Sequence, residues 1–359
     1  MNRRTFTVRT LGTAALFAAT LASAQTPAKV GFVYVGPVGD SGWTFQHDVA
    51  RRQMETALKG KVTTQFVENV PEGADSERVI REMAQSGCKV IFATSFGYMN
   101  PALKVAEQFP NTIFMHATGY RTAPNLGQYD GRFYEGRYLN GVIAGKMTKS
   151  HIAGYVGSFP IPEVVMGINA FARGMRSVDP KAEVRVVWVN SWVDPGKERE
   201  AALTLIAQGA DMLVHETDTA AVNQAAQEKG AKVFCYNSDE IKYAPKAQLG
   251  GTILTWGDYY TKVVSDVLAG KWKSGFIWGG LKEGFIKMAP MSADVPKAVQ
   301  EQVKKLEAEI KAGKFHPFAG PVVDQDGKVR VPAGQVMADE DLQKMDFFVQ
   351  GVASKMPTK

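Results

Sequence analysis

Segments typical of buried strands alternate with segments typical of helices along most of this chain, and the series runs twice. The first strand candidate, residues 29–35, is a continuous apolar run, which is characteristic of a parallel strand covered on both faces. A loop rich in Gly, Pro and Asp follows it, and a helix is expected over residues 45–58. Strict alternation of this kind predicts doubly wound parallel sheets. Because the series breaks near residues 147–152 and then begins again, we predict two similar α/β lobes in tandem.

The remaining elements are expected at regular intervals. In the first lobe they are strands over 63–67, 90–93 and 112–116 and helices over 74–86, 101–108 and 135–146. In the second lobe they are strands over 152–156, 183–188, 212–215 and 232–236 and helices over 167–177, 197–208 and 220–229. The rest is expected to hold helices over 259–268 and 295–312, a strand-like stretch over 272–287, a hairpin over 320–331 and a closing helix over 339–351. We therefore place lobe 1 at 27–148, with returning segments at 256–290 and 313–359, and lobe 2 at 149–255, to which the helix 295–312 could belong.

The first 24 residues are predicted to be a secretory signal. Arg3 and Arg4 precede an apolar stretch over residues 11–21 that contains no acid, and Ala-Ser-Ala at 22–24 supplies the small side chains of a cleavage site. The Arg-Arg-x-Phe start favours the twin-arginine type of signal. A buried N-terminal helix is the alternative interpretation. We expect the mature protein to be periplasmic.

Composition limits the remaining choices. About 335 residues are left after cleavage, which fits two domains of about 150 residues each. An apolar content of 45% and a charged content of 22% are those of an ordinary globular protein. The signal carries three arginines and no acid, so the formal net charge falls from +6 to about +3. This weakly basic balance does not indicate a nucleic-acid partner.

The two cysteines, Cys88 and Cys235, both lie in apolar, strand-like surroundings. We expect two buried free thiols in separate lobes, with a single disulfide as the alternative. No Cys or His spacing suggests a metal site, and we expect neither a metal nor a cofactor.

Ligands of open α/β sheets lie beyond the carboxyl ends of the strands. In this chain, the loops at those positions carry aromatic and short polar side chains one after another, a combination that suits a planar heteroaromatic ligand. Each residue alone is weak evidence, because a single tryptophan can be a packing residue and Asp40 can be a helix cap. The ligand-binding candidates are Asp40, Trp43, Thr44, Phe96, Gly97, Tyr98, Glu163, Trp192, Asp218, Asn237, Asp239 and Trp256.

Sequence signatures of enzymes are missing. The chain has no Gly-x-Ser-x-Gly elbow, no phosphate-binding Gly-x-x-x-x-Gly-Lys loop and no dinucleotide fingerprint after the first strand. His215 alone among the histidines falls at a predicted strand end close to acids, where a structural role is the commoner outcome. We expect a binding protein and not an enzyme.

Several loops together resemble a known family. The matching segments are residues 39–48, 94–98, 131–139, 154–163, 190–198, 208–211 and 317–321. Through them the chain resembles the basic membrane protein family of ABC-importer substrate-binding proteins, which includes purine nucleoside receptors. The resemblance implies a type I periplasmic binding fold, with two lobes joined by a multi-strand hinge, a ligand in the cleft, hinge closure and an inner-membrane ABC permease as partner. We expect a monomer.

The resemblance also implies roles for individual residues. Trp43 and Trp192 match two aromatic positions that sandwich the purine from opposite lobes, and Thr44 falls where a polar residue reads the edge of the base. Asn237 and Asp239 fall near an acidic pair that holds ribose.

Two departures from the family pattern concern the sugar-binding side. Asn237 replaces the first acid of that pair, and residues 255–260 form a shorter segment that lacks a ligand-binding lysine and carries Trp256. These changes favour a free purine base such as adenine over a nucleoside. Three alternatives stay open: a receptor for a sugar or other small polar ligand on the same fold, a transcriptional regulator, and a periplasmic enzyme such as a nucleoside hydrolase.

Overall fold

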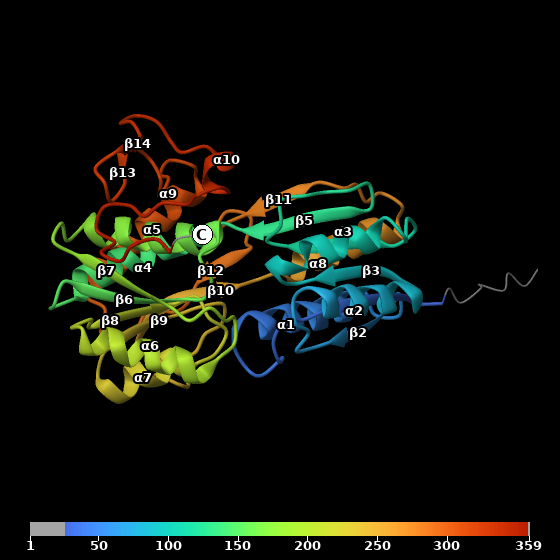
Figure 1. Ribbon diagram of the computed structural model, residues 1–359, viewed down its shortest axis with the longest axis horizontal. Helices are drawn as coiled ribbons and strands as arrows, with labels where there is room; N and C mark the ends of the chain where they lie inside the picture. Colours follow the sequence, from blue (N-terminus) through green and yellow to red (C-terminus); the bar gives the residue numbers. More distant parts are fainter. Residues whose placement is uncertain (1–25, 358–359) are drawn as a thin grey trace, which may run out of the picture.

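The computed structural model describes residues 26–357, which form two α/β lobes (Figure 1). The signal predicted at 1–24 lies outside the described residues. Lobe 1 is built on a six-stranded sheet with the strand order β11-β5-β4-β3-β1-β2, in which all neighbours are parallel. Its strands are β1 (Ala28–Val33), β2 (Val62–Val67), β3 (Cys88–Ala93), β4 (Ile113–Ala117), β5 (Leu126–Gly131) and β11 (Phe276–Gly279).

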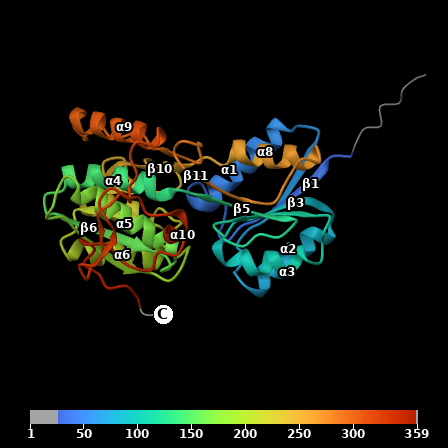
Figure 2. The ribbon, with the colours of Figure 1, turned by 90° about the horizontal axis from the view of Figure 1, so that it is seen from above.

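Helices cover both faces of this sheet, as Figure 2 shows. One face carries α1 (Gly42–Ala57) and α8 (Gly257–Leu268), and the other carries α2 (Ala74–Gln85) and α3 (Met99–Ala106), which follows the short 3₁₀ helix η1 (Phe96–Tyr98). The continuous apolar run of β1 is buried on both faces of the sheet, as expected. Phe32 and Val33 are both fully buried, yet they belong to separate hydrophobic clusters on opposite faces of the strand.

Lobe 2 repeats this plan with the strand order β12-β10-β9-β8-β6-β7. Its strands are β6 (Ile152–Gly157), β7 (Glu183–Trp188), β8 (Met212–His215), β9 (Lys232–Cys235), β10 (Gln248–Leu254) and β12 (Ile286–Met288), of which only β12 runs antiparallel to its neighbour. Its helices are α4 (Phe133–Met147), α5 (Pro162–Arg176), α6 (Pro195–Ala207), α7 (Ala221–Lys229) and α9 (Lys297–Lys311). The chain passes between the lobes three times, after β5, after β10 and after β11.

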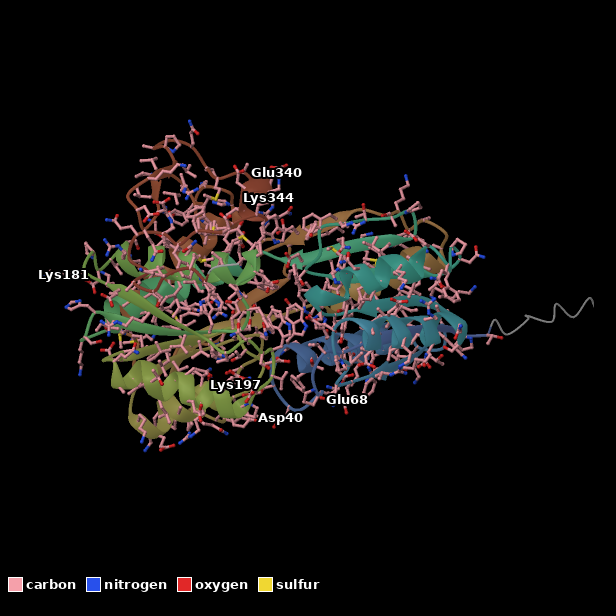
Figure 3. All side chains as sticks on the ribbon, in the orientation of Figure 1. Asp40, Glu68, Lys181, Lys197, Glu340 and Lys344 are labelled. Atoms are coloured by element: carbon pink, nitrogen blue, oxygen red, sulfur yellow. The ribbon has the colours of Figure 1, made fainter. Side chains whose placement is uncertain are left out.

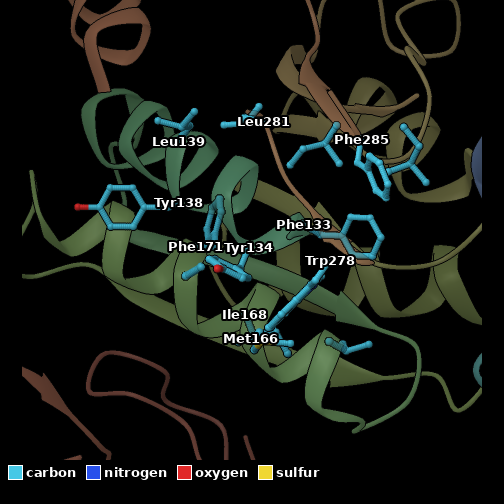
Figure 4. Close-up of a cluster of buried hydrophobic side chains, with 14 of the residues drawn as sticks. Phe133, Tyr134, Tyr138, Leu139, Met166, Ile168, Phe171, Trp278, Leu281 and Phe285 are labelled. Atoms are coloured by element: carbon cyan, nitrogen blue, oxygen red, sulfur yellow. The ribbon is translucent and has the colours of Figure 1, made fainter. Parts of the chain in front are cut away.

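Helix α4 belongs to lobe 2, although the sequence placed residues up to 148 in lobe 1. It is buried on almost all sides and packs closely against α5 (Figure 4). A methyl group on Gly141 would lie 2.2 Å from the carbonyl oxygen of Phe171, and one on Gly174 would lie 2.1 Å from the carbonyl oxygen of Tyr138. Only glycine at both positions allows the two helices to approach this closely.

The C-terminal segment also lies on lobe 2, whereas the sequence analysis returned residues 313–359 to lobe 1. Val352 forms a bridge beside Val184 of β7, and the Asn169 side chain of α5 donates a 2.8 Å hydrogen bond to the carbonyl oxygen of Phe347. The segment contains the expected hairpin, β13 (Val322–Val323) with β14 (Val329–Val331), but the closing helix is a single turn, α10 (Asp339–Leu342). The segment covers apolar surface of α5 and β7 that would otherwise face water.

Both cysteines are free within the described part of the chain, and both are buried. Cys88 lies in β3 of lobe 1 and Cys235 in β9 of lobe 2, which confirms the expectation of two separate thiols.

Candidate functional site

A cavity lies between the two lobes at the carboxyl ends of both sheets, where ligands of this class of fold bind. We call it the cleft cavity and define it by its lining residues, which are Val35, Trp43, Ser95, Phe96 and Thr118 from lobe 1 and Glu163, Trp192, Glu216, Thr217, Asp218, Tyr236 and Asn237 from lobe 2. Six of the twelve candidates from the sequence line this cavity: Trp43, Phe96, Glu163, Trp192, Asp218 and Asn237.

The other candidates are held elsewhere by contacts within the protein. Asp40 is exposed at the outer edge of the lobe junction (Figure 3), where it pairs with Lys242 and accepts a hydrogen bond from Tyr243. Asp239 is exposed as well, and its carboxylate accepts a 2.7 Å bond from the side-chain amide of Gln248. Neither acid therefore faces the cleft cavity.

Two further candidates lie behind the wall of lobe 1. The Gly97 N–H donates a 2.9 Å hydrogen bond to Glu72, and Tyr98 is buried with its hydroxyl donating to the carbonyl oxygen of Val70 at 2.6 Å. Thr44 is fully buried directly behind Trp43. Its backbone N–H donates to an oxygen of Asp218 at 3.3 Å.

Trp43 is fixed in place by contacts with both lobes. Its indole N–H donates a 2.7 Å bond to the carbonyl oxygen of Thr94, and its backbone N–H donates to Asp218 of the other lobe. Its ring meets His47 edge-on at 4.5 Å and Trp256 edge-on at 6.3 Å between centroids. The indole on the cavity wall is therefore held rigidly, as a stacking surface requires.

Trp256 belongs to the hydrophobic core behind this wall. Its side chain is only 1% exposed and lies parallel to the His47 ring, 5.6 Å away and with 4° between the planes. The residue precedes α8, which packs against α1. Its position after a strand end is as expected, but the helix contact turns the indole into the core and away from the cleft cavity.

The burial of His47 leads to a prediction about acid stability. The ring is completely buried and contacts the Tyr260 hydroxyl, and burial lowers the pKa of His47 from 6.5 to about 3. Between these two values the unfolded chain binds a proton at this residue while the folded chain does not. The free energy of unfolding is therefore expected to fall with pH below about 6.5, with a limiting slope from this residue of about 1.4 kcal/mol per unit. Urea unfolding at pH 7.0, 5.5 and 4.5 measures this change.

A substitution isolates the contribution of His47. His47→Gln is expected to remove one proton's share of the pH dependence, whereas His116, a second histidine whose pKa burial lowers, keeps its own share in that variant. An unchanged slope in His47→Gln would show that other groups cause the acid sensitivity.

Trp192 faces the cavity from lobe 2 and reaches across the cleft. Its indole N–H donates a 3.3 Å hydrogen bond to Glu72 of lobe 1, and its ring lies 5.1 Å from that of Phe159. The side chain is only partly buried. The two tryptophans named by the resemblance thus come from opposite lobes and share one cavity.

Three carboxyl groups, those of Glu163, Glu216 and Asp218, form part of the remaining wall. Burial raises the pKa of Glu163 well above its usual value, and the negative charges of Asp130 and Glu216 raise it further. Burial likewise raises the pKa of Asp218 to about 8, against the effect of the N–H groups of Trp43 and Thr44. Because their pKa values are raised, these carboxyl groups offer a ligand acceptor oxygens and, where protonated, O–H donors.

One buried arginine lies beneath these acids. Arg137 of α4 is fully buried, donates a 2.6 Å bond to the carbonyl oxygen of His215, and lies 3.6 Å from Glu216. Its guanidinium also covers the Tyr236 ring at 3.8 Å. Burial raises the pKa of Glu216, and the charge of Arg137 opposes this rise. His215 itself lies beneath the cavity and not on its wall, so it has the structural role that its sequence position favoured.

The sequence of this chain matches one protein family over almost all of the described residues. The family is described as ABC transporter substrate-binding protein PnrA-like, and its model matches residues 28–317. This chain belongs to that family. Its members are the substrate-binding proteins of ABC transporters, and the resemblance drawn from the loops is thereby confirmed.

Two relatives and one solved structure show which known proteins this substrate-binding protein is similar to. It is 52% identical to a purine-binding protein of Brucella abortus (strain 2308) over 94% of this chain and 96% of the relative. It is 38% identical to a Haloferax volcanii protein provisionally named an ABC transporter glucose-binding protein, over 91% of this chain and 81% of the relative. A solute-binding protein of an ABC transporter system from Aeropyrum pernix K1 superposes with a TM-score of 0.70 at 19% identity, covering 84% and 95% of the two chains. The type I periplasmic binding fold is thereby confirmed.

Six lining residues of this substrate-binding protein were not among the sequence candidates. Ser95, Glu216 and Thr217 lie in loops that the strand-end rule had already marked, but their small or charged side chains gave no further signal. Val35 lies two residues after β1 and Tyr236 directly after β9, and both fall inside the strands predicted from the sequence. Thr118 directly follows β4, and no candidate was predicted in that loop. A stricter use of the strand-end rule would have found all six.

Residues 26–357 were also compared with what a membrane-spanning helix and a metal site require. None of the helices in this part is long and apolar enough to cross a membrane. No group of three or more His, Cys, Asp or Glu side chains in this part is arranged to hold a metal ion.

Proposed function

We propose that this substrate-binding protein captures a free purine base, adenine or a close analogue, in the cleft cavity and presents it to an inner-membrane ABC permease. The observation that supports this most directly is the pair Trp43 and Trp192, which face one small cavity from opposite lobes. An indole on each side suits a flat heterocycle, and stacking contributes about 1–3 kcal/mol per face, by analogy with bases on aromatic side chains.

The carboxyl groups on the wall suit a ligand edge with hydrogen-bond donors and acceptors. Adenine carries an amino group, a ring N–H and acceptor ring nitrogens, and Glu163, Glu216 and Asp218 line the cavity. Glu216 and Asp218 are already bonded to hydroxyl and N–H groups of the protein, so Glu163 is the carboxyl group that remains to select a ligand by hydrogen bonding.

The missing ribose contacts favour a base over a nucleoside. Asp239, which the resemblance relates to ribose binding, is exposed and bonded to Gln248. The relative that is 52% identical is itself named a purine-binding protein.

A second candidate ligand is a sugar. Tryptophan faces and carboxylates also suit sugar hydroxyls, and the Haloferax volcanii relative bears the name of a glucose-binding protein. We favour the purine because two indoles on opposite sides suit a planar ring on both its faces.

The wider role follows from the family. We propose an extracytoplasmic protein that is exported by the predicted signal at 1–24 to the periplasm, acts as a monomer, and binds its ligand by hinge closure without chemical conversion. The closed form is the state that the permease would recognise.

Titration calorimetry with adenine, adenosine, guanosine, inosine and glucose tests this proposal. We expect adenine to bind most tightly, with adenosine at least tenfold weaker. Tighter binding of the nucleosides than of adenine would overturn the preference for a base, and binding of glucose alone would favour the second candidate. Assaying adenosine and inosine for release of the base during the same titrations tests the absence of catalysis.

A further inference from the structure

The N-terminus of α1 in lobe 1 is capped by side chains of lobe 2. The first N–H groups of a helix have no partner within the helix, and the residue before it usually supplies a side-chain oxygen. Among the described residues, the N-cap Ser41 makes no such side-chain bond, although serine is a favoured cap. Instead the Gly42 N–H donates a 2.9 Å bond to Ser238, and the N–H groups of Trp43 and Thr44 donate to the two carboxylate oxygens of Asp218.

Glycine at position 42 makes this contact sterically feasible. Gly42 has a φ of +92°, and a methyl group added there would lie 2.2 Å from a carboxylate oxygen of Asp218 and 2.8 Å from its carbonyl oxygen. Any other residue would collide with the opposite lobe as well as strain the backbone. The fit between the lobes therefore depends on the absence of a side chain at this one position.

We propose that Asp218 and Ser238 form a latch that closes the cleft by capping α1 across the lobes, and that Gly42 is the position that admits it. Asp218 lines the cleft cavity and also bonds the backbone of Trp43, so the same carboxylate that faces the ligand sets the position of the stacking indole. Closing the lobes and completing the ligand site are then one event. Asp218, Ser238 and Gly42 act as positioning residues, and this inference rests on the proposed hinge closure.

The exposed contacts at the same junction are less suited to this task. Lys242 and Asp40 are paired at the rim with about half or more of each side chain exposed, and such pairs contribute little to stability. The bonds of Asp218 are partly buried, the bond between Gly42 and Ser238 is buried, and the Gln46 side chain adds a 3.1 Å bond to Ser238. The latch is therefore assigned to Asp218 and Ser238, which are better shielded from water than the pair at the rim.

The test compares two glycines with nearly the same positive φ. Gly42 and Gly73 both precede or begin helices of lobe 1, with φ of +92° and +95°, but a methyl group on Gly73 would meet nothing within 4 Å. Gly42→Ala is expected to weaken adenine binding about tenfold, whereas Gly73→Ala binds as the wild type does. Melting temperatures of both free variants measure the strain separately. Ser238→Ala, which removes a bond without strain, is expected to weaken binding about threefold and provides the test if Gly42→Ala does not fold.

A distance measurement tests closure without relying on the identity of the ligand. Spin labels on the exposed positions Glu107 and Lys229, introduced as Glu107→Cys and Lys229→Cys, report the separation of the lobes in free protein and with adenine. Gly42→Ala and Ser238→Ala are expected to shift the distances toward the open form, and Gly73→Ala is not. Distances and affinities equal to wild type in both latch variants would overturn the latch. If the wild type binds no purine, the proposed ligand is wrong. The distances measured in the free wild type and variants then still test the latch.

Discussion

Replacing Trp256 with alanine is expected to lower the free energy of unfolding by about 3–5 kcal/mol, the range observed for large-to-small substitutions in protein cores. The side chain is 1% exposed and contacts aromatic rings on several sides. It stacks on His47 and meets Trp43, Phe133 and Phe285 edge-on. Its removal would leave a large cavity at the point where α1 and α8 meet, because rings held in place on all sides collapse only partly into the space.

Urea or thermal unfolding of Trp256→Ala measures this loss directly. Trp256→Phe, which keeps an aromatic ring in the cluster, is expected to cost clearly less. Ligand affinity of the folded fraction should fall only through the loosened support of Trp43. If Trp256→Ala instead kept its stability and lost its affinity for adenine, the indole would have to be a ligand contact, as the sequence had suggested, and our account of the core would be wrong.

Trp43 and Trp256 show where sequence reasoning reaches its limit. Each follows a strand end and lies at the start of a helix, so the strand-end rule treats them alike. What separates them is the packing of α8 on α1, a contact between segments some 200 residues apart. As a result, the indole of Trp43 lies on the cavity wall and the indole of Trp256 lies in the core. Local sequence contains no signal for that difference.

The fold itself was more predictable than its long-range connections. Alternating strands and helices define both sheets because each element is specified by its own apolar pattern. The assignment of α4 to lobe 2 could not be obtained in that way, since its packing depends on matched glycines at 141 and 174 on two different helices. The C-terminal segment was misplaced for the same reason, because short irregular stretches bury their apolar residues wherever a partner surface is free.

The candidate site, like the fold, could be predicted only in part. The edge of the sheets at which ligands bind was correctly predicted from topology alone. The sequence could not show which acids in those loops face the cavity, because Asp218 and Asp239 both follow strands of lobe 2. The structure turns Asp218 into the cleft cavity and leaves Asp239 exposed.

Trp192→Ala is expected to weaken binding of adenine ten- to hundredfold with little change in the stability of the free protein. Loss of one stacking face removes about 1–3 kcal/mol, and each 1.4 kcal/mol corresponds to a factor of ten in affinity. The side chain is only partly buried, and its one side-chain hydrogen bond, to Glu72, crosses the cleft. Trp192 only borders the hydrophobic core, so the free energy of unfolding should fall much less than in Trp256→Ala.

Calorimetry gives the affinity, and a melting curve without ligand gives the stability. Trp192→Phe is the matched control, because it keeps a ring on lobe 2 and lacks only the indole N–H and part of the stacking area. It is expected to retain most of the affinity, which would assign the loss in Trp192→Ala to stacking and not to the bond with Glu72. Since Trp192 and Trp256 differ in burial and not in chemistry, the two alanine variants should give opposite results: one loses ligand and keeps its fold, the other loses stability. Unchanged affinity in Trp192→Ala would mean that the ligand does not lie between the two indoles.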